Sequence, residues 1–252
     1  MKIGVTLPTF SGDASGVIDA ALAAEAAGLY GVFSFDHQWP LGHPERPSLS
    51  VYPTLGAVGA ATTQIQVGTL VARIGLLPDE VVIASIESLH RAVSDRLIAG
   101  LGTGDDASSP EHLRYGLPYA GAASRLERLA KVLGRLGTSG IDRWVGAGSA
   151  ATNRVAREAG ATLNYWGVSP ARVAAAKALG PSPVTWGGPL PDDVDEASAR
   201  LRLLAEAGAG WVVWGWPRSL DLVVEAAGAA GVELAPAGTR AGTPIKGVRT
   251  AE

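Results

Sequence analysis

The chain contains no cysteine. Disulfide bonds, thiolate nucleophiles, zinc–thiolate sites and iron–sulfur clusters are therefore excluded. Histidine is also scarce: the chain has four, and they show neither HxH nor HxxxH spacing. A histidine-rich metal site is consequently not expected, and the sequence predicts no bound metal.

Clusters of positive charge and long apolar runs are missing as well. The net charge is −3 and no Lys/Arg cluster occurs, so nucleic acid is not an expected partner. No apolar stretch reaches the roughly 18 residues that span a bilayer, and the chain starts directly with a strand-like run rather than a signal peptide. We therefore expect a cytoplasmic protein with no membrane partner.

What is present is a strict alternation of short apolar segments with longer helical ones. The apolar segments are continuous, which is typical of parallel strands buried on both faces. They cover residues 2–7, 32–35, 65–71, 96–101, 143–147, 162–166, 182–186 and 211–216. Between them run apolar stripes of helical period, such as Leu126, Leu129, Leu133 and Leu136.

Eight strand–helix units in 252 residues favour one α/β domain, a (β/α)8 TIM barrel over residues 1–235. An open, doubly wound sheet is the main rival. Residues 236–252 lack periodicity and are rich in Gly, Thr and Pro. We expect a flexible C-terminal tail there, or an arm that lies on a partner subunit.

The most informative site candidates are Asp36 and His37, at the end of the second strand. Active sites of such barrels lie at the C-terminal ends of the strands. A histidine titrates near neutral pH, so His37 could move a proton or polarise a substrate oxygen. The alternative is that His37 only caps the strand or binds a loop.

Two further turns could hold a ligand. Residues 101–106, LGTGDD, close the fourth strand, where glycine lets a flat ligand approach the backbone; an ordinary strand-exit turn is the alternative. Residues 145–152, VGAGSAAT, run from a strand through small residues into a helix, whose N-terminus favours anions. A dinucleotide fingerprint would need glycine at Ala151, so a phosphate of a mononucleotide-type cofactor is the better hypothesis, and a simple tight turn is the alternative.

Tryptophans gather near several strand ends. Trp39, Trp166 and Trp186 could wall a slot for a ring and contact substrate, although a single tryptophan in such a barrel is more often packing than a ligand contact. Trp144 and Trp211 open their strands and are predicted to be structural.

Taken in order, these segments resemble the luciferase-like monooxygenase superfamily, (β/α)8 barrels that use reduced flavin or the deazaflavin coenzyme F420. The resemblance runs from Lys2 to about Asn164. It is carried by Phe35-Asp36-His37, AATT at 60–63 with QVGT at 66–69, SDRL at 94–97, GLGTG at 100–104 and WVGAGS at 144–149. The Asp-His pair and the Gly-Thr-Gly-acid run are most similar to the F420-dependent branch.

The resemblance implies roles for individual residues. Asp36 and His37 would lie against the cofactor ring, and Asp105 would occupy the general-acid position. Leu70-Val71 matches a bulge where the family has a non-prolyl cis peptide behind the ring. The full cofactor-binding set that we predict is Asp36, His37, Leu70, Val71, Gly104, Ser108, Gly146, Ala147, Gly148 and Ser149.

The chain departs from the family pattern at several positions. Asp105 stands for a longer glutamate, Ser108 for a common asparagine, and Arg73 for a smaller polar residue. No lysine and arginine clamp for a sugar phosphate is evident, so that substrate is not predicted.

The resemblance implies an oxidoreductase that moves a hydride between F420 and a small organic substrate, with His37 and Asp105 as catalytic residues and a homodimer as the assembly. An FMN-dependent monooxygenase using O2 is the alternative, and a non-catalytic flavin or deazaflavin carrier is the second alternative.

Overall fold

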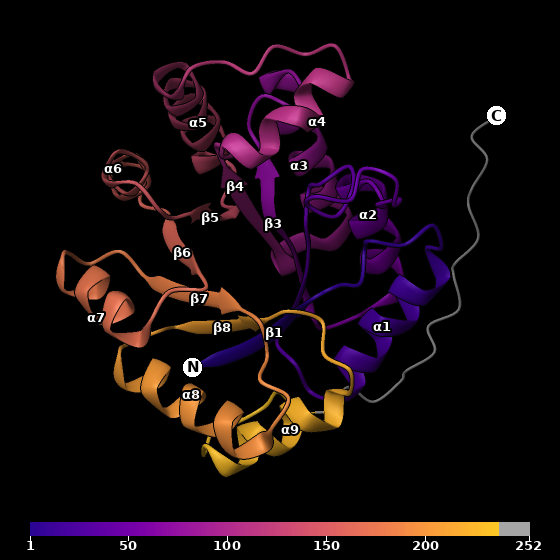
Figure 1. Cartoon of the computed structure of the whole chain (residues 1–252), viewed down its shortest axis with the longest axis vertical. Coiled ribbons are helices and arrows are strands. Elements are labelled where there is room, and N and C mark those ends of the chain that lie inside the picture. The colour runs from indigo at the N-terminus through magenta and orange to yellow at the C-terminus, as the bar shows by residue number, and fades with distance from the viewer. Residues whose placement is uncertain (237–252) are drawn as a thin grey trace.

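The computed structural model describes residues 1–236 and shows a closed barrel of eight parallel strands in the order β1 to β8 (Figure 1). Successive strands pair, and β8 closes on β1 with Trp214 opposite Val5. The predicted TIM barrel is therefore confirmed, and the open-sheet rival is excluded. The strands are β1 (Lys2–Thr6), β2 (Gly31–Ser34), β3 (Gln66–Arg73), β4 (Leu97–Gly102), β5 (Asp142–Gly146), β6 (Thr162–Trp166), β7 (Val184–Gly188) and β8 (Trp211–Trp214).

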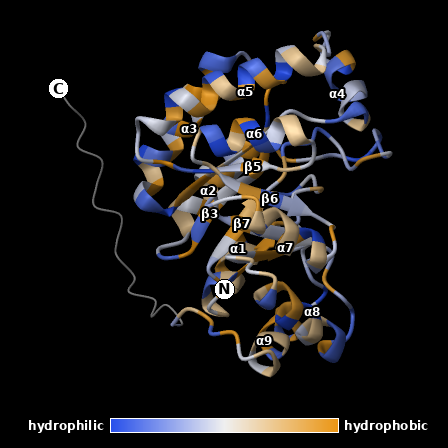
Figure 2. Ribbon diagram, turned by 90° about the vertical axis from the view of Figure 1, so that its left-hand side faces the viewer, coloured by the Kyte–Doolittle hydropathy of each residue, from blue (hydrophilic) through white to orange (hydrophobic). Residues whose placement is uncertain are grey.

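Helices surround the barrel with their apolar faces inward, and Figure 2 shows these faces orange and the outer faces mostly blue. On α5 the predicted stripe is buried at Leu129, Leu133 and Leu136. The helices are α1 (Ser15–Ala26), α2 (Val51–Ala61), α3 (Asp79–Val93), α4 (Ser109–Arg114), α5 (Ala122–Gly137), α6 (Ala150–Glu158), α7 (Pro170–Ala178), α8 (Val194–Glu206) and α9 (Leu220–Ala229), with 3₁₀ turns η1 (Ser94–Arg96) and η2 (Asp106–Ser108).

Aromatic rings fill one end of the barrel interior. Phe33 lies 5.3 Å from Trp144 and 5.9 Å from Trp211, measured between ring centroids, and the two tryptophans are 5.5 Å apart. Glycines on neighbouring strands make room for these rings: a Cβ on Gly68 would lie 2.8 Å from the Phe33 ring. Trp144 and Trp211 are thus structural, as predicted, and they close the barrel beneath the mouth.

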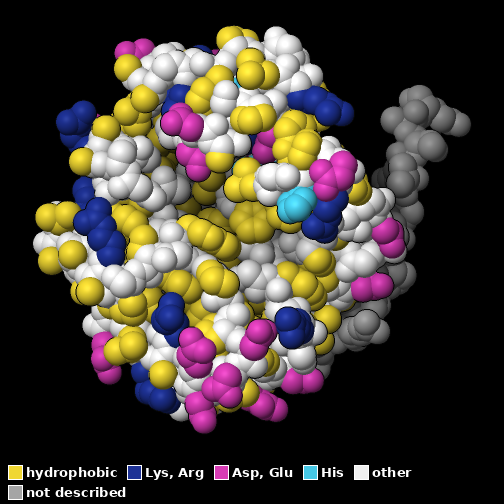
Figure 3. Space-filling view, viewed as in Figure 1, with side chains coloured by type: hydrophobic (Ala, Val, Ile, Leu, Met, Phe, Trp, Pro, Cys, Tyr) yellow, Lys and Arg dark blue, Asp and Glu magenta, His cyan; other side chains and the backbone are white. Residues whose placement is uncertain are grey.

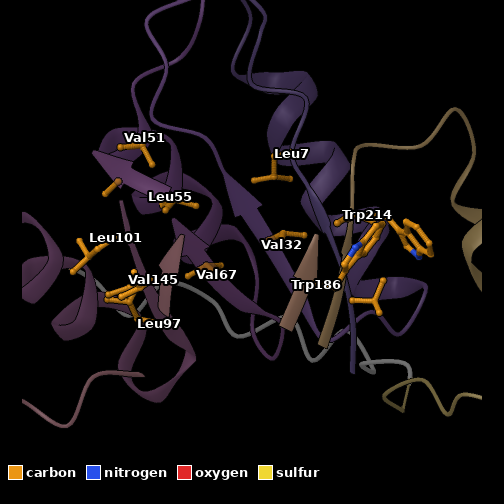
Figure 4. Packing of buried hydrophobic residues seen from close by; sticks show 14 of the residues in the cluster. Leu7, Val32, Val51, Leu55, Val67, Leu97, Leu101, Val145, Trp186 and Trp214 are labelled. Atoms are coloured by element: carbon orange, nitrogen blue, oxygen red, sulfur yellow. The ribbon is translucent and has the colours of Figure 1, made fainter. Parts of the chain in front are cut away.

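Alternate residues of the same strands face outward and pack against the helices. Figure 4 shows Val32, Val67 and Val145 in this outer layer, with Trp186 and Trp214 side by side at its other end. Both layers are apolar, which explains why the strands read as continuous hydrophobic runs.

Residues 237–252 lie outside the described part of the chain, and the predicted flexible tail or arm falls almost wholly within them. Within residues 1–236, no helix has both the length and the apolar character needed to cross a bilayer.

Replacing Gly100 by alanine tests the close packing of β3 against β4. A Cβ at this position would overlap the carbonyl oxygen of Thr69, whose hydroxyl donates to Gly100 O at 2.6 Å. We expect Gly100→Ala to lower the free energy of unfolding in urea by about 1–3 kcal/mol.

Gly134→Ala in α5 is the matched control, because its added Cβ meets nothing within 4 Å. This variant should gain about 0.5–1 kcal/mol from helix propensity. Equal stability of the two variants would contradict the packing argument.

Candidate active site

His37 follows β2 and is held by a glutamate that the sequence analysis did not select. Its Nδ1 lies 2.7 Å from Oε1 of Glu111 in α4. The second carboxylate oxygen, Oε2, accepts from Arg73 Nη2 at 2.5 Å and from the Gln38 backbone N–H at 2.8 Å. Both oxygens of Glu111 are therefore occupied, and one side chain joins the connections after β2 and β4 to the end of β3.

This group of charges is deeply buried. Glu111 is 0% exposed and Arg73 is 3% exposed. Burial raises the pKa of Glu111, but the hydrogen bonds from His37 and Gln38 and the charge of Arg73 outweigh it, so its pKa lies below the usual 4.5. Glu111 is thus a carboxylate at neutral pH, and Arg73 supplies the balancing charge.

Asp36, which was predicted to lie against the cofactor ring, does not line the cavity. Its Oδ2 accepts the backbone N–H of Arg73 at 2.9 Å, which ties the end of β2 to the end of β3. Burial raises the pKa of Asp36 above its usual range, against the opposing effects of the Arg73 hydrogen bond and charge. The Asp36 carboxylate therefore holds the backbone of Arg73.

A cavity of about 720 Å³ opens beside His37 at the C-terminal mouth of the barrel, which is within the roughly 300–1,000 Å³ of typical ligand sites. Figure 3 shows the hollow near the centre of this face, with hydrophobic side chains prominent around it. Of the predicted site residues, the cavity is lined by His37, Leu70, Val71, Gly104, Asp105, Ser108, Gly146, Ala147, Gly148, Ser149 and Trp166.

The Leu70–Val71 peptide bond is cis, as the sequence analysis predicted. It lies at a bulge where the register between β3 and β4 shifts after Thr69. Val71 then packs so closely over β4 that a Cβ on Gly102 would overlap its Cγ2 atom. Gly102 is therefore required by Val71, in addition to any role in admitting a flat ligand.

The turn before α6 has the features predicted for an anion site. Ser149 is the N-cap, and its hydroxyl accepts from the Thr152 N–H at 3.0 Å. Thr152 Oγ1 lies 2.9 Å from Ser149 Oγ, and both residues line the cavity. The free amides and dipole of a helix N-terminus favour negative charge here.

Asp105 lines the cavity but is engaged in a turn. Its Oδ1 accepts from the Ser108 N–H at 3.2 Å and from the Ser108 hydroxyl at 3.1 Å, which caps η2. The carboxylate therefore shapes the loop that carries Glu111, and its predicted general-acid role stays a prediction.

Two of the three tryptophans predicted to contact substrate do not line the cavity. Trp186 is 1% exposed, donates from Nε1 to Val168 O at 2.8 Å and packs edge-on against Trp214. Trp39 is buried under the Arg114 guanidinium, 5.8 Å from its ring centroid. We therefore correct the placement of both: each is buried against local partners and does not line the cavity.

The aromatic wall of the cavity combines Trp166, which was predicted to contact substrate, with Phe10 and Phe35, which were not assigned to the site. Phe10 stacks on Phe35 at 5.8 Å between centroids, and Phe35 meets Trp166 edge-on at 5.6 Å. Phe10 follows β1 as Phe35 follows β2, so the position of an aromatic residue just past a strand end was the available signal. The sequence signal for Glu111 was weaker: it is an acidic residue in the long connection after β4, at the same C-terminal face of the barrel.

Glu111→Gln tests the buried ion pair through pH. The pKa of Glu111 is lowered on folding, so its stabilising contribution is present above about pH 4.5 and is lost as the pH falls through the lower folded value. We expect the unfolding free energy of the variant, measured in urea at pH 7, to be about 3 kcal/mol below that of wild type. This difference between the two proteins should become smaller towards pH 3.

Glu45→Gln is the matched control. Glu45 Oε1 lies 3.3 Å from His43 Nδ1, but both side chains are more than half exposed, and exposed pairs contribute roughly 0–1 kcal/mol. A gap between wild type and Glu111→Gln that does not change with pH would argue against an ionised Glu111.

No protein-family model matches the chain. It is 34% identical over 116 residues to an F420-dependent glucose-6-phosphate dehydrogenase of Nakamurella multipartita, and 30% identical over 118 residues to that of Microbacterium testaceum. These matches cover 46% of this chain and 33% and 34% of the relatives, so the chain aligns with about a third of their length.

Solved structures agree over nearly the whole chain. An F420-dependent secondary alcohol dehydrogenase in complex with an F420–acetone adduct gives a TM-score of 0.74 at 12% identity, covering 91% of this chain and 98% of the other. The F420-dependent tetrahydromethanopterin reductase of Methanopyrus kandleri gives 0.69 at 15% identity, covering 90% and 97%. A monooxygenase from Streptomyces bottropensis gives 0.68 at 12% identity, covering 90% and 95%. The predicted barrel fold is thus shared with F420-dependent enzymes and a monooxygenase, and the predicted sequence resemblance to F420-dependent enzymes is found over 116 and 118 residues.

Proposed function

We propose that this chain is an F420-dependent oxidoreductase that transfers a hydride between the deazaflavin and a small organic substrate. The observation that carries the proposal is His37, held by a buried carboxylate and facing a cavity at the C-terminal mouth of the barrel. The F420-dependent proteins that the chain resembles in sequence and fold support the choice of cofactor.

The cavity residues fit a planar ring that carries a phosphate. Val71 and neighbouring glycines line the cavity, as does an aromatic group made of Phe10, Phe35 and Trp166. The hydroxyl groups of Ser149 and Thr152 and the first amides of α6 could donate to an anion, whereas the Gly148 and Thr152 amides are already bonded within the turn. This combination of an apolar slot and a few polar groups is typical of cofactor sites.

The deazaflavin, when bound, would supply the hydride acceptor or donor at C5. His37 would accept the hydroxyl proton of an alcohol as the hydride leaves the adjacent carbon, and would return it to the carbonyl oxygen in the reverse direction. Phe10, Phe35 and Trp166 would keep water from the reacting atoms. Because no clamp for a sugar phosphate is evident in the sequence, the substrate that we propose is a small alcohol or carbonyl compound rather than a sugar phosphate.

The second candidate is an FMN-dependent monooxygenase that uses O2. It is favoured by the fold likeness to the Streptomyces bottropensis monooxygenase and by the same phosphate-type turn at Ser149, which suits FMN equally. The third reading, a non-catalytic carrier of flavin or deazaflavin, also keeps the cavity but assigns His37 no turnover. Homodimerisation, expected from the resemblance, stays a prediction.

A titration of the protein with F420 and with FMN separates these candidates. We expect F420 to bind with a change in absorbance or fluorescence, and FMN to bind at least tenfold more weakly. His37→Ala should keep F420 binding within about threefold and lose roughly 10²–10⁴-fold in turnover, the usual contribution of a general acid or base.

Absence of F420 binding would contradict the proposal, and O2-dependent turnover with reduced FMN would decide for the monooxygenase. Unchanged turnover in His37→Ala would support the carrier.

Ser149→Ala tests whether the α6 turn holds an anionic group of the cofactor. Loss of the cap should cost about 1 kcal/mol of stability and weaken F420 binding by roughly tenfold. Both effects would be measured on the same sample, by urea unfolding and by the titration above.

Ser169→Ala is the control. Ser169 caps α7, which like α6 is nine residues long, through the same kind of side-chain bond, but it does not line the cavity. It should show the loss of stability without the loss of affinity. Equal affinities in the two variants would remove Ser149 from the proposed site.

A further inference from the structure

We propose that Glu111 and Arg73 are positioning residues that fix the tautomer of His37, so that Nδ1 carries the proton and Nε2 presents its lone pair to the cavity. The inference deepens the function proposed above and rests on it for its catalytic consequence, but the tautomer itself is a property of the free protein.

The first step is the charge state of Glu111. Oε2 faces two fixed donors, Arg73 Nη2 at 2.5 Å and the Gln38 N–H at 2.8 Å, and Oε1 lies 2.7 Å from His37 Nδ1. A protonated carboxyl group would carry its hydrogen on Oε1 and would leave the buried Arg73 guanidinium bonded to an uncharged group. An ionised carboxylate accepts from all three, and the buried Arg73 guanidinium balances its charge.

The second step is the proton on His37. Because an ionised carboxylate can only accept, the 2.7 Å contact requires Nδ1 to be the donor. In neutral imidazole the other nitrogen, Nε2, then has a lone pair. No hydrogen bond to Nε2 is formed by residues 1–236, and the His37 side chain is 20% exposed at the cavity wall. Nε2 is therefore the nitrogen available to a ligand.

Arg73 keeps Glu111 ionised. Without a cation against Oε2, a buried Glu111 would gain proton affinity and compete with His37 for the proton that they share. The Arg73 backbone N–H also donates to Oδ2 of Asp36 at 2.9 Å, and Asp36 directly precedes His37 in the sequence. One arginine thus keeps Glu111 ionised and fixes the backbone that carries the imidazole.

Glu111→Gln is expected to invert the tautomer with little change in shape. The position of Oε2 faces two donors, Arg73 and the Gln38 N–H, so the amide oxygen of the new side chain should occupy it. The amide NH₂ then lies against His37 Nδ1, which must accept, and the proton moves to Nε2. The lone pair needed to receive a hydroxyl proton is lost from the cavity side.

The test is nitrogen-15 NMR of the histidine rings in the free protein at neutral pH, with His37 assigned by its loss in His37→Asn. Wild type should show His37 protonated at Nδ1, and Glu111→Gln should show it protonated at Nε2. Glu45→Gln, which alters the exposed His43 pair instead, should leave the His37 signals unchanged. A wild-type ring protonated at Nε2, or an unchanged tautomer in Glu111→Gln, would overturn the proposal.

If Glu111→Gln does not fold, the double variant Arg73→Met/Glu111→Gln removes both buried charges together and carries the same expected inversion. In the folded variant, F420 binding should stay within about threefold of wild type, whereas turnover should fall by roughly 10² or more. Failure of wild type to bind F420 would remove the proposed function and leave the tautomer assignment standing, so the two failures are distinguishable.

Discussion

The buried ion pair between Arg73 and Glu111 is the constraint on which the rest of the site depends. It joins the end of β3 to α4 in the connection after β4, and through His37 and Gln38 it also holds the connection after β2. Opposite charges out of water attract strongly but cost much to desolvate, so further hydrogen bonds help to hold such a pair. At Glu111 both oxygens have partners, whereas Nε and Nη1 of Arg73 are buried with none among the described residues.

This arrangement separates the roles of the acids around the cavity. Glu111 is buried beside a cation and ionised, Asp36 is buried with its pKa raised, and Asp105 is exposed and caps a turn. His37 combines a position fixed by Glu111 with a second ring nitrogen that no described residue binds, at the cavity wall. The loop chemistry at Asp105 and Ser108 matters because it sets where α4, and therefore Glu111, lies.

The fold was predictable from the sequence because both layers of the barrel are apolar. Each strand buries one face against the central rings and the other against helices, so every strand stands out as a hydrophobic run between helical stripes. The cis bond at Leu70–Val71 was expected from the family resemblance, and the turn at Ser149 from a short local motif. Trp39 and Trp186 were misplaced because proximity to a strand end does not say which way an indole turns.

The sequence by itself determined the eight-stranded barrel, the strand ends at which a site could form, and His37 as the residue to examine. Tertiary structure alone brought Glu111 to His37 across 74 positions of the chain and placed Arg73 beneath them. No pattern in composition or spacing reports such a contact, because it depends on how two long loops fold over the mouth. The proton position on His37, and hence what the residue can do, follows from that contact.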